Sequence, residues 1–169
     1  LADGNNRTLE RRADGSWDES AVGHGTPGRE NSILNFSTNY LPLVISEVFP
    51  NSAGDDNANK PFGEWVEIYN LGEDVVDMSR FVLKDQDDDH ELIISDSKIL
   101  GWDGLLLYPG DYIVVYRDGD SDFSLNNEGY EEVRLFAGTE LVDEMSYTGS
   151  TEGMSWSNVE GNWYITIPT

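Results

Sequence analysis

The residues of this sequence best suited to chemistry are aspartates at alternating positions. Asp118, Asp120 and Asp122 occupy every second position, and carboxylates spaced in this way can converge on one cation. Calcium is the ion that such a set would take, because it binds roughly six to eight oxygen ligands. The helix–loop–helix calcium motif is not matched, since Phe123 and Gly129 stand where it needs glycine and glutamate. A solvated turn after a strand is the alternative interpretation.

A second acidic run lies earlier in the chain. Asp85, Asp87 and Asp89 alternate in the same way, and His90 follows them. Neighbouring carboxylates repel each other, so a bound cation would stabilise the run by neutralising it. Aspartate also favours tight turns, because its side chain accepts hydrogen bonds from nearby backbone amides. The run therefore predicts either a hairpin turn or a second calcium site.

The other polar residues do not indicate catalysis. Glu64 and Glu67 would have to supply the acid and base of a glycoside hydrolase, yet residues three apart on a strand face opposite sides. His24 and His90 fall in predicted loops, and the sequence contains no GxSxG, P-loop, HExxH or CxxC motif. Cysteine is absent, which removes thiolate metal sites. We predict that the chain is not an enzyme.

Five tryptophans offer a non-catalytic alternative, because sugars stack on exposed aromatic rings. Trp102 and Trp156 are the candidates for such a surface, whereas Trp65 and Trp163 look like framework residues. A carbohydrate-binding module stays open beside a packing role for these rings.

The elements that must position these residues are strands. Val66 and Ile68 alternate with Trp65, Glu67 and Tyr69, which is the period of a strand and not of a helix. Turn-forming residues bound each apolar stretch. Many short strands at this spacing predict an all-β fold, an antiparallel two-sheet sandwich with Greek-key connections. The predicted strands lie near 43–49, 64–70, 75–83, 91–95, 105–108, 111–117, 131–137, 141–147 and 162–167.

The strand pattern also predicts which side chains form the core. These are the apolar residues on the inward side of each alternation. They are Leu43, Ile45, Val66, Ile68, Met78, Phe81, Leu83, Ile93, Leu107, Ile113, Val115, Val133, Leu135, Val142 and Trp163.

The charge of the chain limits its partners. It carries 33 acidic and 10 basic residues, net −23, and residues 32–169 alone hold 27 acidic and six basic residues, net −21. Such a surface repels phosphate backbones, so we do not expect a nucleic-acid partner. No stretch approaches the roughly 20 apolar residues needed to span a bilayer. The acidity suits divalent cations, basic protein partners or a salty medium, besides simply keeping the chain in solution.

The amino-acid sequence of the predicted strands resembles that of the lamin tail domain, also called the intermediate-filament tail domain. Glu47 follows the first strand, and GEWVEIYN (63–70), VVDMSRFVLKD (75–85) and PGDYIVVY (109–116) come after it. The resemblance implies an immunoglobulin-like sandwich, and the family brings no catalytic residue set. In bacteria and archaea, similar domains occur in exported multidomain proteins. We therefore expect a prokaryotic extracellular or cell-surface module that acts in structure or protein interaction. An accessory domain of an extracellular hydrolase or nuclease is the further alternative.

The first 31 residues read differently from the rest. Thr8-Leu9-Glu10-Arg11 followed by Asp14-Gly15-Ser16-Trp17 echoes Gly153-Met154-Ser155-Trp156 followed by Glu160-Gly161-Asn162-Trp163. We interpret residues 1–31 as the C-terminal remnant of a preceding similar domain, or as an extended arm. Residues 32–41 would be a linker and 42–169 the lamin-tail-like domain. Tandem copies would follow, and residues 1–31 could exchange strands with a neighbouring chain.

Overall fold

The structure is a computed structural model that describes residues 8–11, 17–20, 42–100 and 104–169. Its regular elements are antiparallel strands, together with two single-turn 3-10 helices, η1 (Met78–Arg80) and η2 (Asp96–Lys98). Buried and half-buried side chains alternate along β6 and along the first five residues of β3, as the sequence pattern predicts.

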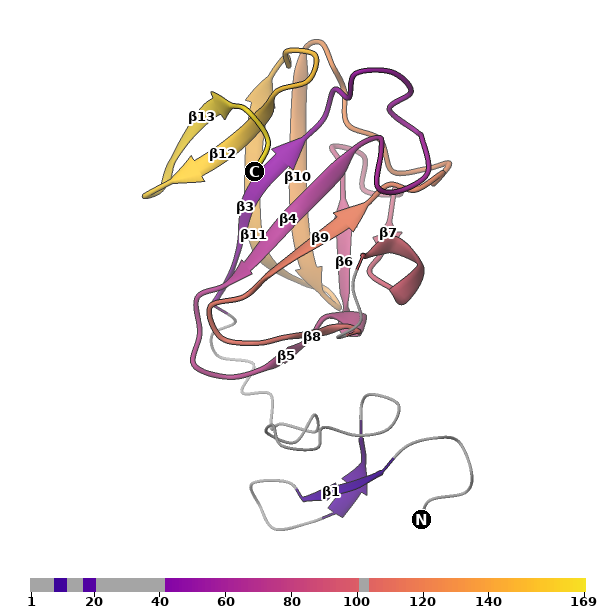
Figure 1. Ribbon diagram of the computed structural model, residues 1–169, viewed down its shortest axis with the longest axis vertical. Helices are drawn as coiled ribbons and strands as arrows, with labels where there is room; N and C mark the ends of the chain where they lie inside the picture. Colours follow the sequence, from indigo (N-terminus) through magenta and orange to yellow (C-terminus); the bar gives the residue numbers. More distant parts are fainter. Residues whose placement is uncertain (1–7, 12–16, 21–41, 101–103) are drawn as a thin grey trace.

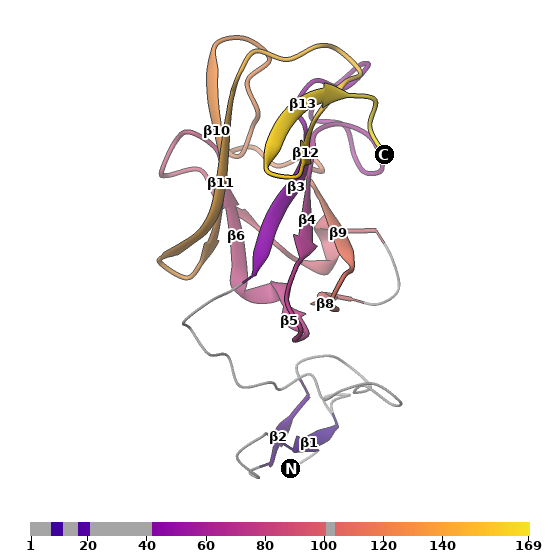
Figure 2. The ribbon, with the colours of Figure 1, turned by 90° about the vertical axis from the view of Figure 1, so that its left-hand side faces the viewer.

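Two sheets form the body of the domain (Figure 1). One has the order β13-β12-β3-β4-β9 and the other has the order β11-β10-β6-β7. The first sheet consists of β3 (Leu43–Phe49), β4 (Trp65–Asn70), β9 (Tyr112–Tyr116), β12 (Ser155–Val159) and β13 (Asn162–Thr166). The second consists of β6 (Phe81–Lys84), β7 (Leu92–Ile93), β10 (Tyr130–Ala137) and β11 (Glu140–Thr148). Figure 2 shows β3, β4 and β9 on one side and β6, β10 and β11 on the other.

The order of the strands is that of a Greek key. Within the first sheet, β3, β4 and β9 lie side by side in chain order, and the later β12 returns to the free side of β3. The apolar core fills the space between the two sheets. The fold is thus an immunoglobulin-like antiparallel sandwich, as the sequence predicts.

Two smaller sheets complete the description. β5 (Val76–Asp77) pairs with β8 (Leu106–Leu107), and β1 (Leu9–Arg11) pairs with β2 (Trp17–Glu19). The predicted strand 75–83 is split into β5 and β6 by η1. The cause is local: the Asp77 carboxylate accepts a hydrogen bond from the backbone N–H of Ser79 at 3.0 Å, which caps the helix.

The core differs from its prediction at a few positions. Ile93 is 60% exposed, while its neighbours Leu92 and Ile94 are buried, so the predicted face of that strand was shifted by one residue. Val142 and Trp163 are half-buried at the margin of the core. The strand β12 was not predicted, because its sequence SWSNV is mostly polar.

Candidate functional site

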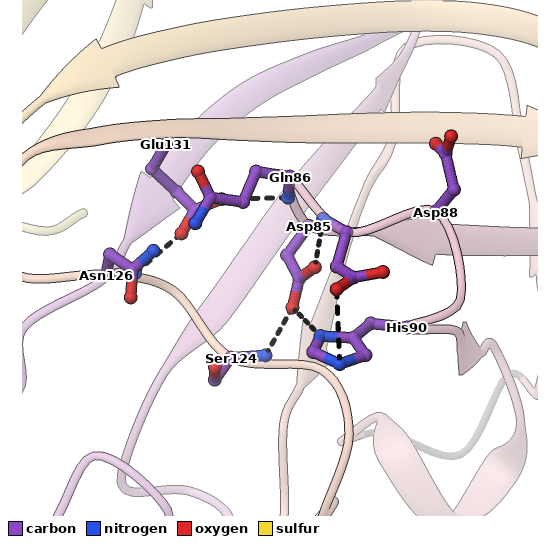
Figure 3. Close-up of a pocket in the computed structure, with 8 residues that line it drawn as sticks. Asp85, Gln86, Asp88, His90, Ser124, Asn126 and Glu131 are labelled. Carbon is purple, nitrogen blue, oxygen red and sulfur yellow. Dashed lines mark hydrogen bonds and ion pairs between the residues drawn. The ribbon is translucent and has the colours of Figure 1, made fainter.

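A polar pocket of about 510 Å³ opens between two loops (Figure 3). Residues 85–90, the turn after β6, form one side, and Ser124 and Asn126 from the connection between β9 and β10 form the other. Glu131 enters from β10. This pocket contains the second acidic run that the sequence singles out, so it is the first place to examine for chemistry.

Asp85 lies at the centre of the first half of the pocket and is 2% exposed. Its Oδ2 accepts a hydrogen bond from the backbone N–H of Ser124 at 2.9 Å and lies 3.0 Å from Nδ1 of His90. The hydrogen bond with Asp85 raises the pKa of His90, because the carboxylate favours the imidazolium form. Asp85 therefore holds Ser124 through the backbone and fixes a loop. Nucleophilic catalysis would instead need the serine hydroxyl against the imidazole.

Glu131 forms the second half of the pocket and is fully buried. Its Oε1 accepts hydrogen bonds from the backbone N–H groups of Gln86 and Glu132, both at 2.9 Å. Its Oε2 accepts a third from Asn126, also at 2.9 Å. Burial raises the pKa of Glu131, and these three donors oppose that shift. One side chain thus joins the turn after β6 to the connection after β9.

Glu64 lies just before β4, is 1% exposed and approaches the same connection from the other sheet. Both of its carboxylate oxygens lie 3.3 Å from the backbone nitrogen of Leu125. Its Oε2 also lies 3.0 Å from Nη1 of Arg117. Burial raises the pKa of Glu64 to about 8, although Arg117 and the Leu125 amide pull it down.

In all three cases a buried carboxylate accepts a hydrogen bond from the backbone of the same connection. We call this set, Glu64, Asp85 and Glu131, the carboxylate clamp. Three successive backbone N–H groups, those of residues 124–126, each donate to a different clamp residue. Buried N–H groups outside a sheet must find acceptors, and here carboxylates supply them. The clamp draws Phe123 and Leu125, 0% and 3% exposed, into the core. Its function is to hold the connection between β9 and β10.

The structural role of the clamp residues was not predicted, since Asp85 was a calcium candidate and Glu64 was considered only for catalysis, although the sequence carries a signal for that role. Each is in phase with inward core residues of its own strand, two residues beyond the last of them. Glu64 precedes Val66 and Ile68, Asp85 follows Phe81 and Leu83, and Glu131 precedes Val133 and Leu135. A carboxylate at an inward position where a strand begins or ends marks a structural acceptor.

The first predicted calcium motif does not converge on one point. The Asp118 carboxylate accepts a hydrogen bond from the backbone N–H of Lys60 at 2.8 Å. Asp120 lies 3.3 Å from Nζ of Lys98 and also accepts from the backbone N–H groups of residues 122 and 123. Asp122 lies exposed on the surface.

The second motif forms a turn. Asp85 accepts a hydrogen bond from the backbone N–H of Asp87 at 2.8 Å, and Asp87 accepts one from Asp89 at 3.0 Å, while the Asp89 side chain is exposed. In the described part of the chain, no three or more His, Cys, Asp or Glu side chains gather in a way that could hold a metal ion. Calcium binding at either motif stays a prediction.

The remaining candidate residues are dispersed. Glu67 faces the outer side of the first sheet, away from Glu64, and accepts a hydrogen bond from Ser46 at 2.7 Å. The two glutamates are therefore not an acid–base pair, as their spacing predicts. His90 lies in a loop, as predicted, and its partly exposed ring also contacts the buried Asp85. His24 lies outside the described residues.

The tryptophans divide between framework and margin. Trp65 is 9% exposed and stacks on Phe49 with ring centroids 5.3 Å apart, which confirms its framework role. Trp156, a candidate for an exposed sugar platform, is half-buried and stacks on Tyr147 at 6.1 Å. Trp102 lies outside the described residues. The sugar platform therefore gains no support from Trp156.

An aromatic groove that the sequence did not indicate runs beside β9, the outer strand of its sheet. It has a volume of about 390 Å³. Tyr112 is 58% exposed here and stacks on Tyr69 with centroids 4.4 Å apart. Ile99 forms an isolated bridge to Val115, which places the next residue, Leu100, beside β9. We define the tyrosine groove by six of its lining residues, Leu100, Leu106, Tyr108, Tyr112, Val114 and Tyr116.

Comparison with known proteins gives the family. The profile of the Lamin Tail Domain family matches residues 37–149, which is more than half of the chain. The chain belongs to the lamin tail domain family. The match contains both the carboxylate clamp and the tyrosine groove of this lamin tail domain, whereas β12 and β13 lie beyond it.

Other comparisons add little. A similar solved structure is the archaellum periplasmic stator protein FlaG from Sulfolobus acidocaldarius, at 13% identity and a TM-score of 0.39. The similarity covers 62% of this chain and 97% of that one. A search of curated proteins gives no match. In the described part of this lamin tail domain, no helix has the length and apolar character needed to cross a membrane.

Proposed function

We propose that this lamin tail domain is a non-catalytic module that binds a protein partner within a larger cell-surface or secreted prokaryotic protein. The observation that carries the proposal is the tyrosine groove, where an exposed tyrosine and apolar side chains line a hollow at the outer strand of a sheet. Tyrosine at an exposed, concave surface is typical of protein contact sites. The acidity of the chain and the exported proteins in which similar domains occur support the extracellular part of the proposal.

The charge of the domain indicates the chemistry of the partner. Residues 32–169 carry 27 acidic and six basic residues, net −21. Four of those six bases already face carboxylates: Lys84, Lys98, Arg117 and Arg134 lie 2.6–3.3 Å from Glu91, Asp120, Glu64 and Asp88. A basic partner therefore meets an attractive field, and a polyanion meets a repulsive one. We propose an extended peptide segment with Lys or Arg beside apolar residues, lying in the tyrosine groove.

Selection from a randomised peptide display library on the immobilised full chain tests the proposal. We expect enrichment of segments that mix apolar and basic residues. A synthetic copy should bind at least about tenfold less tightly to the Tyr112→Ala variant, since exposed aromatic anchors dominate such contacts. Tyr164→Ala is the matched control, because Tyr164 is 54% exposed and lies on β13. Raising NaCl from roughly 50 to 500 mM should weaken binding by screening the charges.

Two results would count against protein binding at this groove. One is peptide binding that Tyr112→Ala does not change, and the other is a selection without enrichment. Binding of a neutral polysaccharide that Tyr112→Ala abolishes would favour the carbohydrate-binding alternative instead, since the same rings can stack on sugars.

A further inference from the structure

The cross-strand pairs of the short hairpin β1–β2 can be matched to those of the C-terminal hairpin β12–β13, although five residues separate Arg11 from Trp17 and four separate Asn158 from Trp163. In β1–β2, Arg11 lies opposite Trp17, and three residues further along each strand the backbone N–H of Ser20 donates to the carbonyl of Thr8 at 2.6 Å. Thr8 is thus three positions from Arg11, and Ser20 is three positions from Trp17. These two hydroxyl residues form the last cross-strand pair, at the end of the hairpin away from the Arg11–Trp17 pair.

The C-terminal hairpin has the same arrangement of two cross-strand pairs. Asn158 lies opposite Trp163, and three residues further along each strand Ser155 lies opposite Thr166. Their hydroxyl oxygens are 3.2 Å apart. In both hairpins a glycine stands two positions before the tryptophan, Gly15 in one and Gly161 in the other. The strand registers thus align Thr8 with Ser155, two residues away from the alignment that the sequence echo alone suggested.

The two hairpins differ in how far the apolar side chains on one face are buried. In the C-terminal hairpin, Trp163 and Trp156 are half-buried and pack against the core of the sandwich. By the register, Trp17 corresponds to Trp163 and Leu9 to Trp156. Trp17 is 65% exposed and Leu9 is 44% exposed.

The C-terminal hairpin shows how such a face is normally covered. β12 pairs with β3 through Trp156 opposite Val48 and Ser157 opposite Glu47. The Ser155 hydroxyl donates to the carboxylate of Glu47, which is 2% exposed. The hairpin is therefore joined to the sandwich by its tryptophans on one face and by a buried carboxylate on the other.

We infer that residues 8–20 are the closing hairpin of a second lamin tail sandwich, and that the face bearing Leu9 and Trp17 fits the body of that sandwich where Trp156 and Trp163 lie here. The partner is a protein domain of the same kind as this one. This inference concerns a surface separate from the tyrosine groove, so it stands or fails independently of the proposed function.

A hairpin graft tests the inference. In the full chain, residues 8–20 replace residues 155–166, so that Trp17 takes the position of Trp163. We expect a cooperative melt within about 8 °C of the parent, because the face and register are kept. The matched control exchanges Trp17 with Asp18 inside the graft. This keeps the composition and turns the ring to the opposite face, and we expect it to melt at least about 5 °C below the graft.

A second measurement does not depend on the graft. In the parent chain, Trp163→Ala should lower the melting temperature by at least about 5 °C, whereas Trp17→Ala should leave it within about 2 °C, since Trp17 is 65% exposed. In the graft, Trp17→Ala should cost as much as Trp163→Ala costs the parent. A graft that melts like its exchanged control, or that does not fold, overturns the inference. So does a parent chain in which Trp17→Ala is as damaging as Trp163→Ala.

Discussion

The carboxylate clamp and the tyrosine groove are built from opposite kinds of residue and serve opposite purposes. The clamp places three carboxylates, each at most 2% exposed, against backbone N–H groups of one connection. The groove places tyrosines and aliphatic side chains beside the outer strand β9, and its Tyr112 is 58% exposed. The clamp carboxylates are buried and hydrogen-bonded, whereas the ring of Tyr112 meets the solvent.

This difference shows that an acidic sandwich can use buried carboxylates to hold its own backbone. A buried carboxylate that accepts several backbone hydrogen bonds is fixed in place. An exposed aromatic groove offers apolar area that a partner can cover. We therefore assign stability to the clamp, and the binding that we propose to the groove.

Removal of Glu131 is the change that should break this comparison most strongly. Glu131→Ala leaves three partly buried backbone N–H groups without their acceptor, and an N–H group orphaned in a buried position costs about 1–3 kcal/mol. We expect a loss of about 3 kcal/mol or more in the free energy of unfolding, measured by urea denaturation. Glu128→Ala, an exposed change in the same connection, should stay within about 0.5 kcal/mol. Equal effects of the two variants would show that the clamp does not hold the fold.

The pH dependence of stability should show the burial of Glu64. Its pKa rises from 4.5 to about 8 on folding, so the folded state binds the extra proton between these values. Its contribution therefore favours the folded state most at low pH and is lost as the pH rises through 8, by roughly 1.4 kcal/mol per pH unit within the window.

Comparison with Glu64→Gln isolates this contribution, because other buried carboxylates titrate in both proteins. Denaturation at several values between pH 5 and 8 should give a steeper decline for the parent chain than for the variant. Parallel curves would mean that Glu64 stays ionised in the folded protein.

Calcium gives the smallest expected effect and sharpens the comparison at the two aspartate motifs. Asp120 and Asp85 already accept backbone hydrogen bonds. If these are only turn carboxylates, about 1 mM calcium chloride and 1 mM magnesium chloride should move the melting temperature equally, through screening alone. A rise specific to calcium that Asp120→Asn removes would confirm the prediction made from the sequence.

The fold could be predicted further than the site. Alternation in β3, β4, β6 and β9 predicts the sandwich, because a strand with one buried face leaves a clear period of two. β12 could not be predicted in this way, since its buried Ser155 is held by a polar contact with Glu47 and not by apolar area. Ile93 was placed one residue out of phase because Leu92, Ile93 and Ile94 are all apolar.

The clamp depends on contacts that no local pattern contains. Leu125 and Glu64 are 61 residues apart in sequence, and Ser124 and Asp85 are 39 apart. The sequence shows that these carboxylates lie in phase with the core, but it does not show which amides they meet. The tyrosine groove was missed for a similar reason, since Leu106 and Tyr112 come together only through the turn between β8 and β9.

Hydrogen exchange at single amides, followed by NMR in the full chain, tests most directly whether the carboxylates are structural acceptors. The backbone amides of Ser124, Leu125 and Asn126 lie outside any strand, so without the clamp they should exchange as fast as the exposed amide of Glu128. We expect them to be protected to the same degree as the amides of β10 that pair with β6. Exchange at the rate of Glu128 would contradict the structural assignment of Glu64, Asp85 and Glu131.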